Sequence, residues 1–127
     1  AAKTQWEPDA APWFEKVPTA DIQNNFHRKA AWLEAVLETS RTHAKRGPFG
    51  IFGTAIAGTW LGGMIPETSF FVDEDVHRIG KTHLGKPVRH PDELHPHESV
   101  LIAFPHEIAV SIQRRLASTS KGTFILP

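Results

Sequence analysis

The sequence predicts an α/β fold with a mainly parallel sheet of about 4–5 strands and a long N-terminal helix before it. Short apolar runs of the kind that form buried strands alternate along the chain with runs of helical periodicity. Such alternation favours a parallel sheet, because each connection must return over one of its faces. The chain has 127 residues, 40% of them hydrophobic and 22% charged, which suits one globular core.

Residues 1–18 are expected to form an irregular arm, because three prolines within them interrupt any regular element. The arm also carries Trp6 and Trp13, whose large side chains need an apolar surface to pack on. Two interpretations stay open. The arm packs on its own domain, or its aromatic side chains contact a neighbouring domain.

A single helix is predicted over residues 20–46. Its apolar face repeats every three or four residues. That face comprises Ile22, Phe26, Ala30, Leu33, Leu37 and Ser40. Thr19 or Asp21 can cap the first turn, and cations fill the last turn before Gly47-Pro48 ends the helix.

The remaining elements alternate in kind. Strands are predicted at residues 49–53, 69–73, 87–89, 99–104 and 123–126, the third of them as an edge strand. Helices are predicted at residues 55–64, 91–94 and 105–116. The strands are short and apolar on both sides, as a sheet covered by helices on both faces requires. Residues 19–127 are therefore expected to form a single Rossmann-like domain, half of a doubly wound fold.

Composition argues against several classes of function. Lysine plus arginine equals aspartate plus glutamate, 14 of each, so the cation excess that favours nucleic-acid binding is missing. The sequence has no cysteine and no tyrosine, which excludes disulfides, thiolate chemistry and tyrosine acid–base chemistry. No apolar run approaches the ~20 residues that span a bilayer, so we expect a cytoplasmic chain with no membrane partner.

The strongest candidate site is the turn after the first predicted strand, residues 53–58. Gly53 and Gly58 take the first and third glycine positions of the dinucleotide fingerprint, and Ala55 takes the second. Asp73 lies 20 residues after Gly53, where a carboxylate that binds ribose is expected. The turn is predicted to hold a nucleotide or phosphate on its backbone amides. The alternative, a turn that is merely tight, stays open.

The stretch from His77 to His90 is basic. Its cationic and imidazole side chains are His77, Arg78, Lys81, His83, Lys86, Arg89 and His90. Because it follows the second strand, it can fold over the carboxyl edge of the sheet, where open α/β sheets bind ligands. It is either a flap over a phosphate or a solvated loop. The residues predicted to bind the nucleotide are Gly53, Thr54, Ala55, Gly58, Asp73 and Lys81.

His106 is the candidate catalytic residue. It follows the strand predicted at residues 99–104, at the same edge of the sheet, and could act as an acid, a base or a phosphate donor. The alternative is that it only caps or packs. No metal site is predicted, since the one histidine cluster, His95 and His97 with His90 or His106, has neither a His-Glu-x-x-His helix nor a thiolate.

Several short motifs follow one another in a distinctive order between Gly50 and Pro127. They are Gly53 to Gly58, Asp73, Gly80-Lys81, Gly85-Lys86-Pro87-Val88, Pro91-Asp92-Glu93-Leu94, and Val100-Leu101-Ile102 before Pro105. In this order they resemble the C-terminal domain of sugar C-methyltransferases, and the long helix before Gly47 fits that layout. The chain departs from the family at Ala57, where a lysine is frequent, and at His106, where a tryptophan is common.

The resemblance implies that the methyl donor sits on another domain, so this chain alone is not expected to methylate a substrate. The expected function is a nucleotide-sugar or related phosphate-ligand binding domain, a non-catalytic part of a larger C-methyltransferase-like enzyme. Its expected partners are a nucleoside diphosphate sugar and either a neighbouring catalytic domain or a second copy. The alternative is an interaction module that kept the fold and lost the ligand, for which Ala55 and Ala57 in the turn argue.

Overall fold

The computed structural model describes the chain from residue 19 to residue 127. The predicted arm at residues 1–18, with Trp6 and Trp13, lies outside the described residues, as do the side chains of Ile22 and Phe26. By its internal contacts the chain divides into two units, and the boundary falls between Leu33 and Glu34. The sheet and the candidate site belong to the second unit.

Helix α2 spans Thr19–Arg46, which confirms the long helix predicted over residues 20–46. In the second unit Val36 and Ser40, four residues apart and so on one face of the helix, are both buried. The Ser40 hydroxyl donates a hydrogen bond to the Val36 carbonyl oxygen at 2.7 Å. A polar side chain can therefore stay on the buried face of α2 without an unsatisfied donor.

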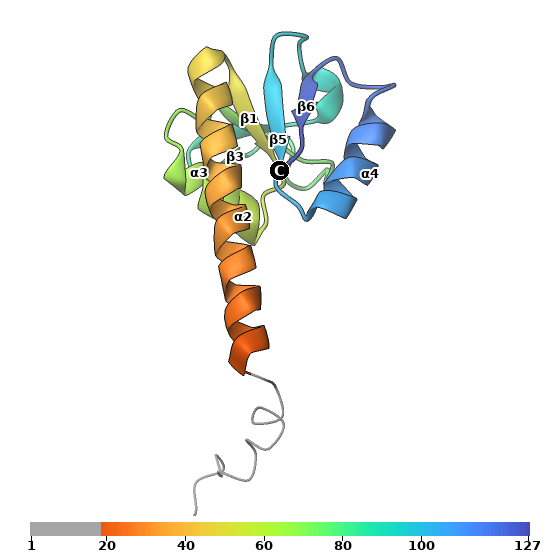
Figure 1. Ribbon diagram of the computed structural model, residues 1–127. Coiled ribbons are helices and arrows are strands. Elements are labelled where there is room, and N and C mark those ends of the chain that lie inside the picture. The colour runs from red at the N-terminus through yellow and green to blue at the C-terminus, as the bar shows by residue number, and fades with distance from the viewer. Residues whose placement is uncertain (1–18) are drawn as a thin grey trace, which may run out of the picture. The chain divides into compact units, whose positions relative to one another are not determined.

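Six strands form one sheet in the order β3-β4-β2-β1-β5-β6 (Figure 1). They are β1 (Phe49–Phe52), β2 (Phe70–Val72), β3 (Thr82–His83), β4 (Lys86–Arg89), β5 (Ser99–Ile102) and β6 (Thr123–Ile125). All neighbouring strands are parallel except β3 and β4, so the chain is an α/β protein with a mixed, mostly parallel sheet. The predicted count of about 4–5 strands is wrong, because the two residues of β3 are too few to show a periodicity.

The strand β4 was predicted as an edge strand, and this is also wrong. β3 pairs with its outer side in an antiparallel hairpin, Thr82 opposite Pro87 and His83 opposite Lys86. The two linking residues, Leu84 and Gly85, have φ of 50° and 75°. Positive φ at both positions is the geometry of a tight hairpin turn whose twist matches the strands. The turn therefore reverses the direction of the chain, so that β3 lies at the edge of the sheet beside β4.

The two central helices cover opposite faces of the sheet. Neighbouring strand residues such as Ile51 and Phe52 point to opposite faces. Helix α3 (Ile56–Met64) packs on the Ile51 side, because a Cβ built on Gly58 would lie 3.6 Å from Ile51 Cγ2. Helix α4 (His106–Leu116) packs on the Phe52 side. The buried core on that side comprises Phe52, Phe70, Val72, Leu94, Val100, Ile102, Ala109, Leu116 and Phe124.

A partly buried ion pair lies at the border of the core on the α4 side, near the short helix η2 (Pro91–Glu93). Arg89 Nη1 donates to Glu98 Oε2 at 2.6 Å, and the Arg89 guanidinium lies 4.9 Å from the centre of the Phe70 ring. The His95 amide donates to the other Glu98 oxygen at 2.8 Å. The Arg89 side chain thus packs over the Phe70 ring on this side of the sheet.

Among the helices described, none has the length and apolar character needed to cross a bilayer.

Candidate functional site

The turn after β1 has the geometry for which its two glycines were singled out. Gly53 has φ of 105°, a conformation that residues with a Cβ rarely adopt, and its N–H donates to the Val72 carbonyl oxygen at 2.8 Å. A Cβ on Gly58 would stand 2.0 Å from the Gly53 carbonyl oxygen. The first glycine therefore permits the turn, and the third lets α3 begin directly against β1.

Helix α3 begins at this turn without a capping side chain. Its N-cap residue is Ala55, which makes no side-chain hydrogen bond to the helix, and no acidic residue lies in the first turn. The next residue, Ile56, is 90% exposed. The positive end of the α3 dipole, at the carboxyl edge of the sheet, is therefore left without a side-chain anion from its own first turn.

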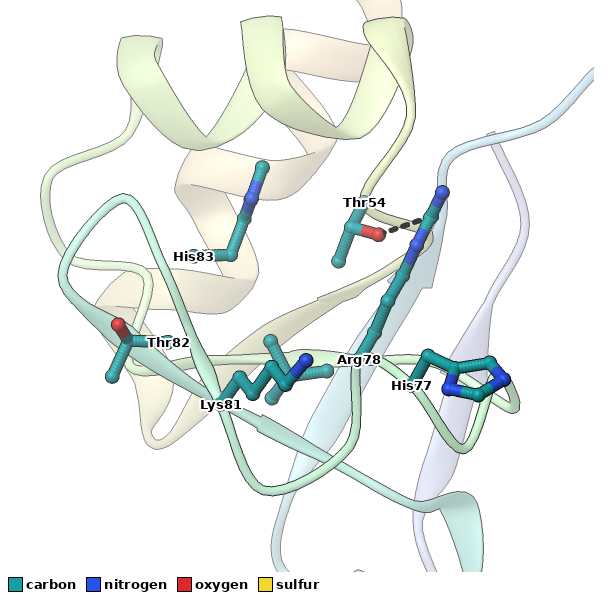
Figure 2. A pocket seen from close by; sticks show the side chains of 7 residues that line it. Thr54, His77, Arg78, Lys81, Thr82 and His83 are labelled. Carbon is teal, nitrogen blue, oxygen red and sulfur yellow. Dashed lines mark hydrogen bonds between the residues drawn. The ribbon is translucent and has the colours of Figure 1, made fainter.

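A cleft of about 290 Å³ opens beside this turn, on the side of β2, β3 and β4 (Figure 2). Its lining combines one residue of the turn with the loop after β2 and the β3–β4 hairpin. These residues are Thr54, His77, Arg78, Lys81, Thr82, His83 and Val88. Two of them are cations and none is a carboxylate, so the cleft suits an anionic ligand.

One hydroxyl connects the turn, the cleft and Asp73. Thr54 Oγ1 donates to Asp73 Oδ2 at 2.8 Å and accepts from Arg78 Nη1 at 2.6 Å, so Arg78 reaches across the cleft to the turn (Figure 2). Arg78 Nη1 also lies 3.4 Å from Asp73 Oδ2. The structure thus places Asp73 beside the predicted turn, with Thr54 and Arg78 between it and the cleft.

The Asp73 carboxylate is held in its charged form. Burial by itself raises the pKa of Asp73, but hydrogen bonds from the Asp75 amide and the Thr54 hydroxyl, together with the charge of Arg78, outweigh it. The pKa of Asp73 therefore lies below its ordinary value. The Asp75 amide donates to Asp73 Oδ1 at 2.9 Å, and the His77 amide donates to Asp75 Oδ1 at 2.9 Å. These side chain–backbone bonds fix the start of the loop that lines the cleft.

A second polar contact ties the hairpin to α3. His83 Nε2 lies 2.8 Å from Thr59 Oγ1, which itself donates to the Thr54 carbonyl oxygen at 3.2 Å. The His83 ring also packs edge-on against Phe71, with ring centres 4.8 Å apart. One wall of the cleft is thereby anchored on both α3 and the core.

The basic stretch from residue 77 to residue 90 divides into two groups. His77, Arg78, Lys81 and His83 line the cleft. The other three serve the fold. Lys86 donates to the Pro66 and Thr68 carbonyl oxygens, Arg89 pairs with Glu98, and His90 caps η2 by accepting from the Asp92 amide. The first half of the stretch is thus the part that faces the cleft.

The crevice between β1 and β5 is occupied by a ring. A Cβ on Gly53 would come within 3.0 Å of Phe104 Cε2, and Phe104 packs edge-on against Phe52 with ring centres 6.2 Å apart. His106 lies just beyond, exposed at the first residue of α4, and does not line the cleft. The open space beside the turn therefore lies toward β4 and not toward β5.

Some of the predicted site residues line the cleft and others do not. Thr54 and Lys81 line the cleft, and Asp73 is hydrogen-bonded to Thr54, whereas Gly53, Ala55 and Gly58 are not among the lining residues. The residue that sequence reasoning passed over is Arg78, which was noted only as part of a basic stretch. Its signal was its place five residues after Asp73, close enough for the loop to return the guanidinium to that carboxylate.

No metal site accompanies the cleft. Within residues 19–127, the described part of the chain, no group of three or more histidine, aspartate or glutamate side chains is arranged to hold a metal ion. His95 and His97 stack with ring centres 5.7 Å apart, and no third histidine, aspartate or glutamate among these residues completes a metal-binding group with them.

In comparisons with known proteins, no protein-family model and no curated protein matches this chain.

Proposed function

We propose that this chain is a binding domain for a phosphate-bearing ligand of the nucleotide-sugar type, built on a Rossmann-like sheet. The observation that carries the proposal is the cleft beside the glycine turn, lined by Arg78, Lys81 and Thr54 and by no carboxylate. Two cations and a hydroxyl offer charge-assisted hydrogen bonds to phosphate oxygens. The uncapped start of α3, two residues after Thr54, adds its dipole to the same attraction.

The order of the parallel strands supports the Rossmann-like part of the proposal. Counted along the chain, the parallel strands β1, β2, β4, β5 and β6 are the first to the fifth, and their order across the sheet is 3-2-1-4-5. Rossmann domains share this order and carry their glycine turn after the first strand and their ribose carboxylate after the second. Gly53 and Asp73 occupy these two places.

The motif order from Gly50 to Pro127 supports a more specific assignment. Its similarity to the C-terminal domain of sugar C-methyltransferases suggests a nucleoside diphosphate sugar as the ligand, and a methyl-donor domain elsewhere in a larger enzyme. In that setting this domain binds and orients the nucleotide, and the methyl transfer itself takes place on the partner domain. His106, exposed and outside the cleft, is then available to a substrate only at the β5 side of the turn.

Calorimetric titration with UDP-glucose and with inorganic diphosphate tests this proposal. We expect both to bind, more weakly as salt is added, and a ligand at one hundred times its dissociation constant to stabilise the fold by about 2.7 kcal/mol. Lys81→Gln should weaken binding several-fold. Arg114→Gln, which removes an exposed cation of α4 outside the cleft, is the matched control and should leave binding unchanged. Absence of binding by both ligands at millimolar concentration would overturn the proposal.

A second candidate, a protein-interaction module, rests on one surface of α3. Ile56, Trp60 and Met64 recur every four residues and are exposed by 90%, 39% and 42%. They therefore form an apolar stripe on one face of the helix. The test is sedimentation of the chain and of Trp60→Lys, with Thr119→Lys, an exposed residue after α4, as the control. Self-association lost in Trp60→Lys alone would favour this candidate.

A further inference from the structure

Arg78 occupies two environments at once. Its side chain is 50% exposed and lines the cleft, while its guanidinium contacts Thr54 Oγ1 at 2.6 Å, Asp73 Oδ2 at 3.4 Å and Asp75 Oδ2 at 3.6 Å. Asp73, by contrast, has a side chain only 15% exposed and does not border the cleft. A ligand in the cleft therefore meets Arg78 before it meets Asp73.

The Oδ2 oxygen of Asp73, which lies behind Arg78, has both of its accepting positions taken. Each carboxylate oxygen accepts about two hydrogen bonds. Asp73 Oδ2 already faces the Thr54 hydroxyl and Arg78 Nη1, and Asp73 Oδ1 already accepts from the Asp75 amide. Of these partners, Asp75 donates through its backbone amide and Thr54 through a short side chain, whereas Arg78 stands on a long, half-exposed side chain. Arg78 is thus the partner that a ligand can displace.

We propose that Arg78 is a specificity-determining residue that couples the recognition of an anionic group to the recognition of a sugar hydroxyl. This proposal rests on the nucleotide-binding function proposed above. An anionic group in the cleft attracts Arg78 away from Asp73. The freed position on Asp73 Oδ2 then accepts a hydroxyl of the same ligand. The site therefore selects molecules that carry a phosphate and a sugar hydroxyl together, and a bare phosphate or a bare sugar satisfies only one half of it.

The charges around the cleft make the exchange possible. Asp73 and Asp75 hold Arg78 from one side, and Lys81 lies on the cleft side, where it favours an anion that arrives there. Without a hydroxyl to replace Arg78, however, a bare phosphate leaves Asp73 with one partner fewer. Its binding is reduced by the cost of breaking the ion pair, while a ligand with a hydroxyl recovers that cost.

The test compares two ligands on the wild type, two variants and one control variant. The dissociation constants of inorganic diphosphate and of UDP-glucose are measured by calorimetry for the wild type, Asp73→Asn and Arg78→Gln, after circular dichroism shows that each is folded. The quantity of interest is the dissociation constant of inorganic diphosphate divided by that of UDP-glucose. A larger ratio means that the sugar nucleotide gains more affinity over the bare diphosphate. Glu74→Gln is the control, because it removes the neighbouring carboxylate, whose partner Arg115 lies outside the cleft.

We expect the ratio to fall in Asp73→Asn only. Asp73→Asn should strengthen diphosphate binding by about two- to five-fold, the value of a partly exposed ion pair, because Arg78 is released. It should weaken UDP-glucose by about ten-fold, because the charged acceptor of the sugar hydroxyl is lost. Arg78→Gln should weaken both ligands several-fold and leave the ratio close to that of the wild type, because both lose the guanidinium while Asp73 still accepts the hydroxyl. Glu74→Gln should change neither constant.

Failure of the proposed function and failure of the coupling through Arg78 give different results. If the wild type binds neither ligand, the proposed function falls and the role of Arg78 falls with it. If the wild type binds diphosphate, but UDP-glucose binds no more tightly, the anion site stands and the coupling is wrong. The coupling is equally wrong if Asp73→Asn weakens both ligands by one factor, or if Glu74→Gln reproduces its effect. If Asp73→Asn does not fold, diphosphate binding by Arg78→Gln decides, because unchanged binding would show that Arg78 does not contact the anion and the coupling would then be wrong.

Discussion

The carbonyl oxygen of Gly53 occupies the space that a Cβ of Gly58 would need, at a distance of only 2.0 Å. Four residues lie between the two glycines in the chain, and over this stretch the backbone passes from the end of β1 through the turn into α3. The neighbour of the missing Cβ is a backbone atom, which cannot rotate away as a side chain could. The position of α3 on the sheet, and with it one wall of the cleft, therefore depends on this contact.

Gly58→Ala is accordingly expected to lower the free energy of unfolding by about 1–3 kcal/mol, the cost of an overpacked site. Gly63→Ala provides the matched control, since Gly63 lies in the same helix with nothing within 4 Å of its Cβ position. That substitution should stabilise the protein by up to about 1 kcal/mol through helix propensity. Urea unfolding of both variants measures the difference. Equal effects of the two would mean that α3 shifts freely on β1.

Gly50→Ala tests a second close approach, within the sheet. A Cβ at residue 50 would lie 2.2 Å from Phe70 Cε2, because the Phe70 ring lies over Gly50 of the neighbouring strand. We expect a loss of about 1–3 kcal/mol in the free energy of unfolding. Since the obstacle is a side chain, Phe70→Leu in the same molecule should recover part of that loss, giving a coupling of at least about 0.5 kcal/mol. Strictly additive effects in urea unfolding would contradict this account.

The ion pair of Glu98 predicts a pH dependence of stability. Burial raises the pKa of Glu98, but the hydrogen bonds from Arg89 and the His95 amide, with the charge of Arg89, outweigh it, so the pKa lies below its ordinary value. A carboxyl whose pKa is depressed by folding stabilises the protein above its unfolded pKa, about 4.3 for glutamate, and loses that contribution as the pH falls. The free energy of unfolding should therefore drop as the pH falls through and below that value.

Glu98→Gln should reduce this acid dependence and lower stability near neutral pH by about 1.5–3 kcal/mol, the range for a hydrogen bond to a charged group. Glu93→Gln, an exposed residue of η2, should keep the slope of the wild type. Urea unfolding at a series of pH values measures the three slopes. Parallel slopes for the wild type and Glu98→Gln would show that another group titrates.

Thr54 offers a further test, because its hydroxyl joins Asp73 and Arg78. Thr54→Val keeps the shape of the side chain and removes the hydroxyl, so Asp73 loses a donor and Arg78 loses an acceptor. We expect the free energy of unfolding to fall by about 0.5–1.5 kcal/mol, the usual worth of such a hydrogen bond. Thr54→Ser retains the hydroxyl and should stay closer to the wild type. Valine and serine variants of equal stability in urea would show that the hydroxyl adds nothing.

Much of the architecture could be read from local patterns. The long helix, the apolar runs of β1, β2 and β5, and the helix that becomes α4 each leave a periodicity or a breaker such as Gly47-Pro48. The hairpin at Leu84-Gly85 leaves neither, because a turn with positive φ is usually marked by Asn or Asp before the glycine and here a leucine takes that place. The extra strand β3 was therefore missed, and β4 was placed at the edge.

The α/β class, the glycines of the turn and the carboxylate at the end of β2 can be predicted from the sequence, because propensity, periodicity and steric demand act over a few neighbouring residues. Which basic side chains share a cleft and which support the fold depends on the folded arrangement. Arg78 and Arg89 look alike in the sequence, yet one reaches Thr54 at the cleft and the other pairs with the buried Glu98. That choice depends on which strands become neighbours, and long-range pairing leaves no trace in any short stretch of chain.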